Sequence, residues 1–170
     1  MNDKKIAVIA LCDPDEPAAI RPYLDALDVP HGCEVELIEV CAEGSTAAAC
    51  QQAMEKTDAK YKVYLAPGSI LIRLTFFQEM LCLFAKDPAI GIIGLIGTPQ
   101  LSTTGELVMS PHIVGNVLYT DDTSFHGEPI EGEMENVMAV SDYLIATQYD
   151  IPWRSDLFHE DSFWAEAQCI

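Results

Sequence analysis

Residues 137–166 read VMAVSDYLIATQYDIPWRSDLFHEDSFWAE and pass from an apolar run, through a proline corner, to an acidic and aromatic segment. The run VMAV predicts a buried strand, and a second mostly apolar segment follows Ser141 and Asp142. Pro152 fixes its own φ and holds Ile151 extended, which predicts a rigid corner at residues 150–154. Acids beside aromatics after this corner suit a site that binds a polyol and removes a proton from it. A solvated acidic face would have the same composition.

Upstream of this stretch, expected strands alternate with expected helices. Strands are expected at residues 6–11, 34–40, 58–66 and 90–96, and helices within residues 17–28, 46–57 and 75–85. This order predicts a parallel sheet with right-handed crossovers, in which ligands bind beyond the carboxyl ends of the strands. The candidate site loops are therefore residues 12–16, 41–45 and 66–70, and we expect Asp13, Ser45 and Gly68 around one cleft.

Single residues refine these elements. The partial alternation of EVELIEV, residues 34–40, favours a strand near an edge of the sheet. The glycines of IGIIGLI, residues 90–96, indicate close packing or a bend. Pro22 predicts a late start for the first helix, and Ser45 and Thr75 are expected to cap the second and third helices.

The second half of the chain changes character. Residues 98–136 are rich in Gly, Thr, Ser, Asp and Glu, and they predict a small β excursion with an acidic loop at residues 121–135. A chain of 170 residues with 49% hydrophobic residues is long enough for one domain with a substantial core. The expected fold is therefore a single α/β domain over residues 1–170.

Charge and cysteine content restrict the partners and the compartment. A formal net charge of −18 argues strongly against nucleic acid and anionic membranes as partners. No apolar run approaches a membrane span, and the apolar segment after Lys4 and Lys5 is too short for a signal peptide, so a cytoplasmic protein is expected. The six cysteines are scattered without C-x-x-C spacing, which predicts reduced thiols rather than disulfides or zinc ligands.

Two segments resemble a known family. Gln148 to Arg154 reads QYDIPWR, and residues 59–65 read AKYKVYL. Both resemble glycosyltransferase-like proteins of the family 2 type, in a bacterial subgroup with the GT-A fold, and the similarity runs from about residue 4 to the C-terminus. The resemblance implies a Rossmann-like, mostly parallel sheet flanked by helices. It also implies transfer of a sugar from a nucleotide-diphosphate sugar to an acceptor hydroxyl. Family members continue further than this chain, so a C-terminal truncation is expected.

The resemblance also implies which residues bind the donor. In the family, the loop after the first strand contacts the base and ribose of the donor, whose N–H and hydroxyl groups can donate hydrogen bonds to carboxylates. Acids in this loop would equally complement the dipole of the following helix. The donor-binding candidates are Asp13, Glu16, Glu43, Ser45, Gly68, Ser69, Asp142 and Arg154. Arg154 is the only Lys or Arg after Lys86, and we expect it to contact either a phosphate or a neighbouring carboxylate, Asp150 or Asp156.

Two positions depart from the family pattern. The family has an acidic metal ligand after its third strand, whereas this chain has Ala66-Pro67-Gly68, with Gly68 at the Asp position. A manganese or magnesium ion would lack its usual ligand, and no metal-binding residue is assigned. The family's general base, which takes the proton of the acceptor hydroxyl, falls at Ala165. Glu160, Asp161 or Glu166 is left for that role.

Three interpretations of function follow. The first is a glycosyltransferase that uses a nucleotide-sugar donor and a hydroxyl acceptor. The second is a catalytically inactive glycosyltransferase-like domain that binds a ligand or a partner, which the residues Gly68 and Ala165 favour. The third is a flavodoxin-like or receiver-like domain with an acidic pocket at Asp13 and Asp15, but it leaves residues 148–154 unexplained.

Overall fold

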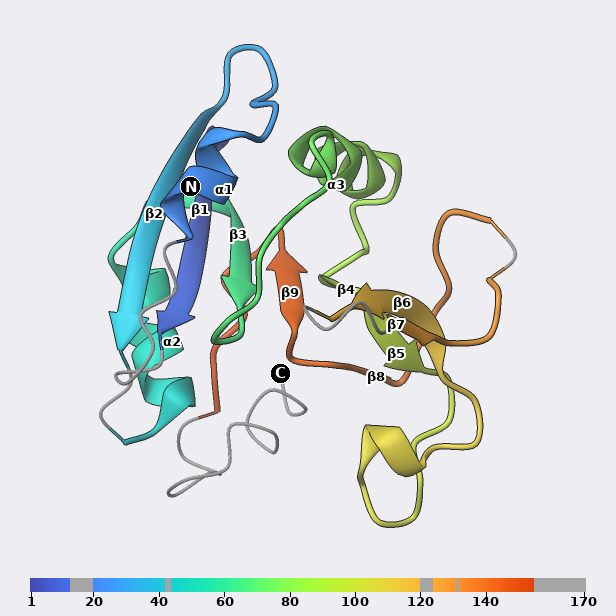
Figure 1. Cartoon of the computed structure of the whole chain (residues 1–170). Coiled ribbons are helices and arrows are strands. Elements are labelled where there is room, and N and C mark those ends of the chain that lie inside the picture. Colours follow the sequence, from blue (N-terminus) through green and yellow to red (C-terminus); the bar gives the residue numbers. More distant parts are fainter. Residues whose placement is uncertain (13–19, 42–43, 120–123, 131, 155–170) are drawn as a thin grey trace.

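The computed structural model describes residues 1–12, 20–41, 44–119, 124–130 and 132–154 (Figure 1). The main sheet contains β1 (Asn2–Cys12), β2 (Glu34–Cys41), β3 (Ala59–Leu65), β4 (Ile92–Gly94) and β9 (Leu144–Thr147). Their spatial order is β2-β1-β3-β9-β4, so β2 lies at an edge as its alternation predicted. Among the described residues, no helix is long and apolar enough to cross a membrane.

The direction of β9 makes the main sheet mixed. β1 pairs in parallel with both β2 and β3, but β9 is antiparallel to its two neighbours, β3 and β4. The four strands expected from the first hundred residues run in one direction, and β9 runs the opposite way between two of them, so the expected mostly parallel sheet is confirmed only in part. The chain enters β9 directly from Ser141 and Asp142, without the crossover helix that a parallel connection requires, so it runs back along β3.

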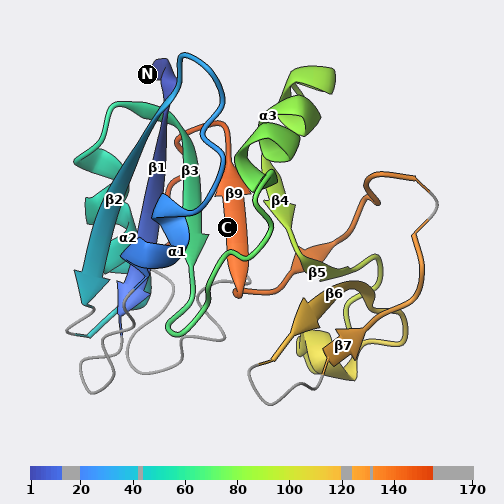
Figure 2. The same cartoon turned by 45° about the horizontal axis from the view of Figure 1, so that its top comes forward.

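Helices cover both faces of the main sheet (Figure 2). On one face, α1 (Arg21–Asp25) and α3 (Phe76–Lys86) bury Leu24, Phe77 and Phe84 against the even-numbered residues of β1. On the other face, α2 (Thr46–Glu55) buries Ala47, Cys50 and Ala53 against the odd-numbered ones. The continuous apolar run of β1 is thus explained by burial on both faces.

The starts of α1 and α2 agree with the sequence, and Ser45 is the one of the two expected caps that forms its bond. Pro22 lies in the first turn of α1, as expected, and the Ser45 hydroxyl accepts a hydrogen bond from the Ala48 amide (3.2 Å) at the start of α2. Thr75 precedes α3 but makes no capping bond, because its hydroxyl donates to the Glu79 carboxylate (2.6 Å) instead. The expectation that Thr75 caps this helix is therefore wrong.

A second, smaller sheet forms the β excursion. Its order is β7-β6-β5-β8, from β5 (Ile96–Thr98), β6 (Val114–Leu118), β7 (Ser124–His126) and β8 (Ala139–Val140). A 3-10 turn, η1 (Leu107–Met109), lies between β5 and β6. The strand expected at residues 90–96 is in fact split between the two sheets, and the run VMAV contributes only its last two residues to β8.

Close packing at a glycine marks this change of sheet. A Cβ placed on Gly94 would lie 2.7 Å from the Val140 Cβ, so only glycine allows β8 to cross the chain at this point. The expectation of close packing or a bend among these glycines is confirmed.

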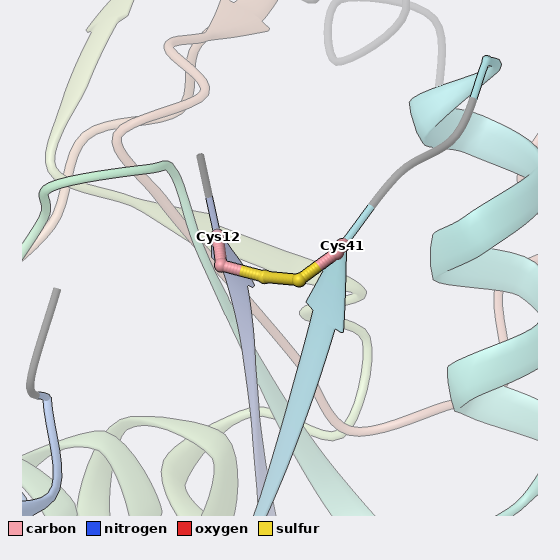
Figure 3. The surroundings of a disulfide bond; sticks show 2 residues. All are labelled: Cys12 and Cys41. Atoms are coloured by element: carbon pink, nitrogen blue, oxygen red, sulfur yellow. A yellow bond between two sulfur atoms is a disulfide. The ribbon is translucent and has the colours of Figure 1, made fainter. Parts of the chain in front are cut away.

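The structure contains a disulfide between Cys12 and Cys41 (Figure 3). The expectation that all thiols are reduced is therefore wrong for this pair. The two cysteines are 29 residues apart in the sequence, yet they are register partners at the last positions of β1 and β2, with Cα atoms 5.0 Å apart. The spacing of Cys12 and Cys41 in the sequence does not reveal their proximity, because the proximity arises from pairing between strands.

Candidate functional site

The strands β1, β2 and β3 all end on the same side of the main sheet (Figure 1). We call this row of strand ends the carboxyl edge, as distinct from the edge strand β2. Because β9 is antiparallel, its first residue, Leu144, pairs with Leu65, the last residue of β3. The Ala66 amide donates a hydrogen bond to the Tyr143 carbonyl (3.3 Å). Asp142 is thereby brought to the carboxyl edge, next to the loop that follows β3.

That loop is a tight turn over residues 66–69. The Ser69 amide donates to the Ala66 carbonyl (3.0 Å), and Gly68 has a φ of 74°, in the left-handed region that favours glycine. Gly68 and Ser69 line a small hollow together with Cys12 and Glu39. The ends of β1 and β3 therefore meet at this hollow, as the strand order predicted.

Asp142 is the most unusual polar group at the carboxyl edge. Its relative exposure is 8%, and its Oδ2 has no hydrogen-bond partner among the described residues. Burial raises the pKa of the Asp142 carboxyl to about 6. The hydroxyl of the adjacent Ser141 is also buried and unpartnered within the described part of the chain. Two neighbouring polar groups without partners among the described residues are a costly arrangement, so Ser141 and Asp142 are the candidates for contact with a ligand.

A tyrosine pair joins the two sheets beside Asp142. The hydroxyls of Tyr119 and Tyr143 lie 3.2 Å apart, and the rings meet edge to face with centroids 6.3 Å apart. The hydrogen bond with Tyr119, together with burial, raises the pKa of Tyr143 to about 12. The sequence did not reveal this pair, because the contact depends on how the small sheet folds back onto β9.

The corner at residues 148–154 begins at the opposite end of β9 from Asp142, runs back to Tyr64 near the end of β3, and makes structural contacts. The Gln148 side-chain amide donates to the Ile90 carbonyl (2.6 Å), and the Trp153 amide donates to the Gln51 side chain of α2 (2.9 Å). The Trp153 ring packs edge to face on Tyr64, with centroids 4.9 Å apart. The corner therefore joins β3, α2 and the segment before β4, which explains its rigid, mixed sequence.

An ion pair between a buried lysine and a half-exposed aspartate anchors the same corner. Lys62, in the middle of β3, is 0% exposed, and its ammonium donates hydrogen bonds to the Asp150 carboxylate and to the Ala59 carbonyl. The sequence signals for this pair are slight: a lysine inside an apolar strand, and an acid two residues before a proline. Nothing in them links Lys62 to Asp150.

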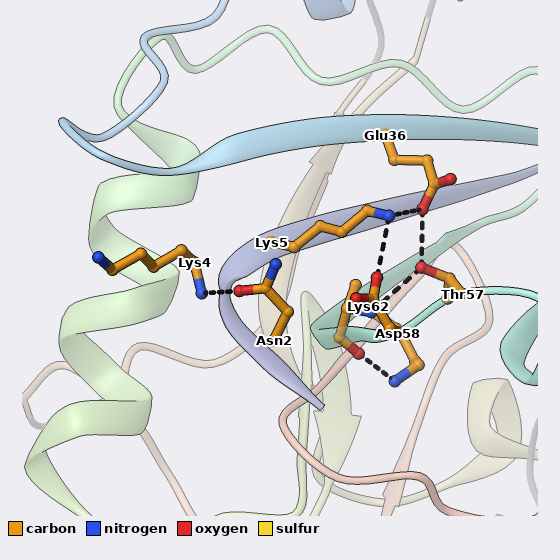
Figure 4. Close-up of polar contacts among 8 residues, drawn as sticks. Asn2, Lys4, Lys5, Glu36, Thr57, Asp58 and Lys62 are labelled. Carbon is orange, nitrogen blue, oxygen red and sulfur yellow. Dashed lines mark hydrogen bonds and ion pairs between the residues drawn. The ribbon is translucent and has the colours of Figure 1, made fainter.

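A polar cluster at the start of the same strands is also structural (Figure 4). The Lys5 ammonium lies 3.0 Å from both Glu36 and Asp58, and the Thr57 hydroxyl donates to Glu36 (2.7 Å). The Thr57 hydrogen bond, followed by the contact with Lys5, lowers the pKa of Glu36. Every member of this cluster has a partner within it, so the cluster helps to fix the positions of the strands.

Several of the predicted site residues cannot be placed. Asp13, Glu16, Glu43, Glu160, Asp161 and Glu166 lie outside the described residues. The expected cleft of Asp13, Ser45 and Gly68 stays a prediction for that reason. Arg154 is exposed and directly follows the buried Trp153.

The turn after β3 offers no carboxylate at Gly68, and no group of three His, Cys, Asp or Glu side chains in the described part of the chain could hold a metal ion.

The protein is thus an α/β domain with a mixed sheet, and a buried carboxyl oxygen, Asp142 Oδ2, has no partner among the described residues at the edge where ligands bind in α/β sheets. The sequence model of a family described as "Glycosyltransferase like family" matches residues 8–170, and the chain therefore belongs to this family. The family resemblance inferred from the sequence is confirmed, and the α/β fold agrees with it. No curated protein matches the chain.

Proposed function

We propose that this protein transfers a sugar from a nucleotide-diphosphate sugar to an acceptor hydroxyl at the carboxyl edge of its main sheet. Membership of the family supports the reaction class. The observation that carries the location is Asp142, a buried carboxylate whose Oδ2 has no partner among the described residues, held beside the Gly68–Ser69 turn. Sugars and ribose present hydroxyl groups, which are the donors that such a carboxylate lacks.

In the proposed reaction, the acceptor oxygen attacks the anomeric carbon while the bond to the diphosphate breaks. The proton of the acceptor hydroxyl passes to a carboxylate, for which Glu160, Asp161 and Glu166 are the candidates. Asp142 and Arg154 line the pocket, and Asp13, Glu16, Glu43 and Ser45 contact the nucleotide. The Ser69 amide is already bonded to Ala66, so Ser69 offers its hydroxyl rather than its amide to a phosphate.

Arg154 provides the first test. A charge-assisted contact to phosphate contributes about 1.5–3 kcal/mol, so Arg154→Ala should weaken nucleotide-diphosphate binding about 10- to 100-fold. Calorimetric titration with several nucleoside diphosphates, with and without manganese, measures this change. Arg73→Ala is the matched control, because Arg73 is an exposed arginine paired with Glu79 outside the carboxyl edge. Unchanged nucleotide affinity together with a lowered melting temperature would show that Arg154 is structural.

Gly68 provides a second test, which concerns the metal. Without a carboxylate at this position, we expect weak or absent manganese dependence of nucleotide binding in the natural sequence. Gly68→Asp should strengthen manganese-dependent binding about tenfold or more. A Cβ on Gly68 would meet no atom within 4 Å, and Asp tolerates positive φ better than most residues, so the variant should fold. Tight manganese-dependent binding by the unmodified protein would contradict this expectation.

The second candidate function is a glycosyltransferase-like domain that binds a ligand without turnover. The absence of a carboxylate in the turn after β3 favours it. Nucleotide binding without release of free nucleotide or sugar transfer, over a panel of sugar donors, would distinguish this function from the first.

A further inference from the structure

The Cys12–Cys41 disulfide lies at the carboxyl edge, where the donor is proposed to bind. Cys12 is the last residue of β1, and it lines the same hollow as Gly68 and Ser69. Cys41 is the last residue of β2, four positions before the Ser45 cap of α2. The bond therefore joins the two strands at the point where each continues into a loop of the candidate site.

The sheet holds the two sulfur atoms together independently of the bond. The β1–β2 ladder runs without a register shift from Lys5↔Glu34 to Cys12↔Cys41. The α2 helix adds a second restraint, because Ala47 and Cys50 pack against Leu11, the residue before Cys12. A pair that the fold already keeps adjacent can open and close without unfolding of the sheet.

The disulfide is also accessible to a small thiol reductant. Cys41 is exposed, so a thiolate of a small dithiol can attack its sulfur and release Cys12 as a thiolate, which then takes up a proton. The second thiol of the reductant displaces Cys41, which leaves two protein thiols and one oxidised dithiol. The other cysteines of the described residues, Cys33, Cys50 and Cys82, are free.

We propose that Cys12 and Cys41 form a reversible thiol–disulfide site that regulates binding at the carboxyl edge. The oxidised pair ties together the ends of β1 and β2 and so restrains the start of α2. In the reduced pair the strand ends stay paired in the ladder, but the covalent restraint on the start of α2 is lost and ligand binding is weaker. The part of this inference that concerns donor binding rests on the proposed function, whereas the coupling of the cysteines to the start of α2 does not.

The experiment compares the full chain, the double variant Cys12→Ser/Cys41→Ser and the control Cys82→Ser, which removes an exposed thiol on α3. Alkylation and mass spectrometry in graded glutathione buffers report the state of the pair. Hydrogen exchange of the Ala48 amide, which is bonded to Ser45, reports the start of α2. Titration with uridine and guanosine diphosphates reports ligand binding.

We expect the pair to oxidise and reduce reversibly, with Ala48 exchange about 3- to 10-fold faster in the reduced protein. Nucleotide binding should be weaker in the reduced protein by a similar factor. The double variant should match the reduced protein in every buffer, and Cys82→Ser should match the natural sequence.

Two results would overturn the inference: a pair that stays reduced in every buffer, or a disulfide that changes neither Ala48 exchange nor nucleotide affinity. If no nucleotide binds in either state, the proposed function fails, and the exchange rates alone decide whether the pair controls the site.

Discussion

Asp150→Ala is expected to lower the free energy of unfolding by about 3 kcal/mol, because it removes the carboxylate that pairs with a fully buried lysine. Lys62 is 0% exposed, so among the described residues its ammonium would keep only the Ala59 carbonyl as a partner. Removing one member of a buried pair costs about 3–5 kcal/mol. Asp150 itself is 48% exposed, and water can partly replace it, which places the expected loss at the lower end. Urea unfolding followed by circular dichroism measures the change.

Removing the lysine of the pair instead should lower the free energy of unfolding much less. Lys62→Met removes the buried charge and leaves Asp150 in contact with water, so we expect a loss of about 1 kcal/mol or less. The double variant should therefore be no less stable than Lys62→Met alone. Asp58→Ala is the matched control, since Asp58 is 68% exposed and pairs with Lys5 at the surface, and it should change stability little. A loss for Asp150→Ala as small as that of the control would show that the buried pair does not support the corner.

Asp142→Asn is expected to remove a pH dependence of stability. The pKa of Asp142 is raised from 3.8 to about 6 in the folded protein, so the folded state binds a proton more tightly than the unfolded state. The protonated Asp142 carboxyl therefore stabilises the folded state at low pH, and this contribution is lost as the pH rises through about 6. Between pH 8 and pH 5 the natural sequence should gain about 1 kcal/mol from Asp142. The Asn variant lacks this gain.

The Asn side chain resembles the protonated carboxyl, so this variant should be more stable than the natural sequence at pH 8, and the difference should shrink by about 1 kcal/mol at pH 5. Urea unfolding at both pH values measures it, with Asp25→Asn on the exposed side of α1 as a control. An equal stability difference at both pH values would show that ionisation of Asp142 carries no penalty. If nucleotide binding falls in the same variant while stability rises, Asp142 belongs to the site.

The sequence predicted those parts of the fold that depend on local chemistry. The apolar run IAVIAL predicted β1, and the alternation of EVELIEV placed β2 at the edge, because these patterns follow directly from burial on two faces or one. Ser45 was identified as a cap because a hydroxyl before a helix satisfies a free amide. The glycines of residues 90–96 were correctly expected to pack closely or to mark a bend. At this point the chain passes from the main sheet to the small one.

For the candidate site, the sequence predicted which residues belong to it but not how they lie relative to one another. Gly68, Ser69 and Asp142 were named from a resemblance, and the structure brings the turn and Asp142 to one edge of the sheet. That Asp142 is buried without a described partner could not be inferred, since burial of a single carboxyl depends on what packs over it.

Only the tertiary structure decided the long-range pairs. Lys62 meets Asp150 from 88 residues away, and Cys12 meets Cys41 because two parallel strands end at the same register position. The antiparallel direction of β9 arises from its short connection to the small sheet and brings Asp142 beside the turn after β3. Strand periodicity sets which face a residue occupies, but the order and direction of strands depend on the free energy of packing the whole chain.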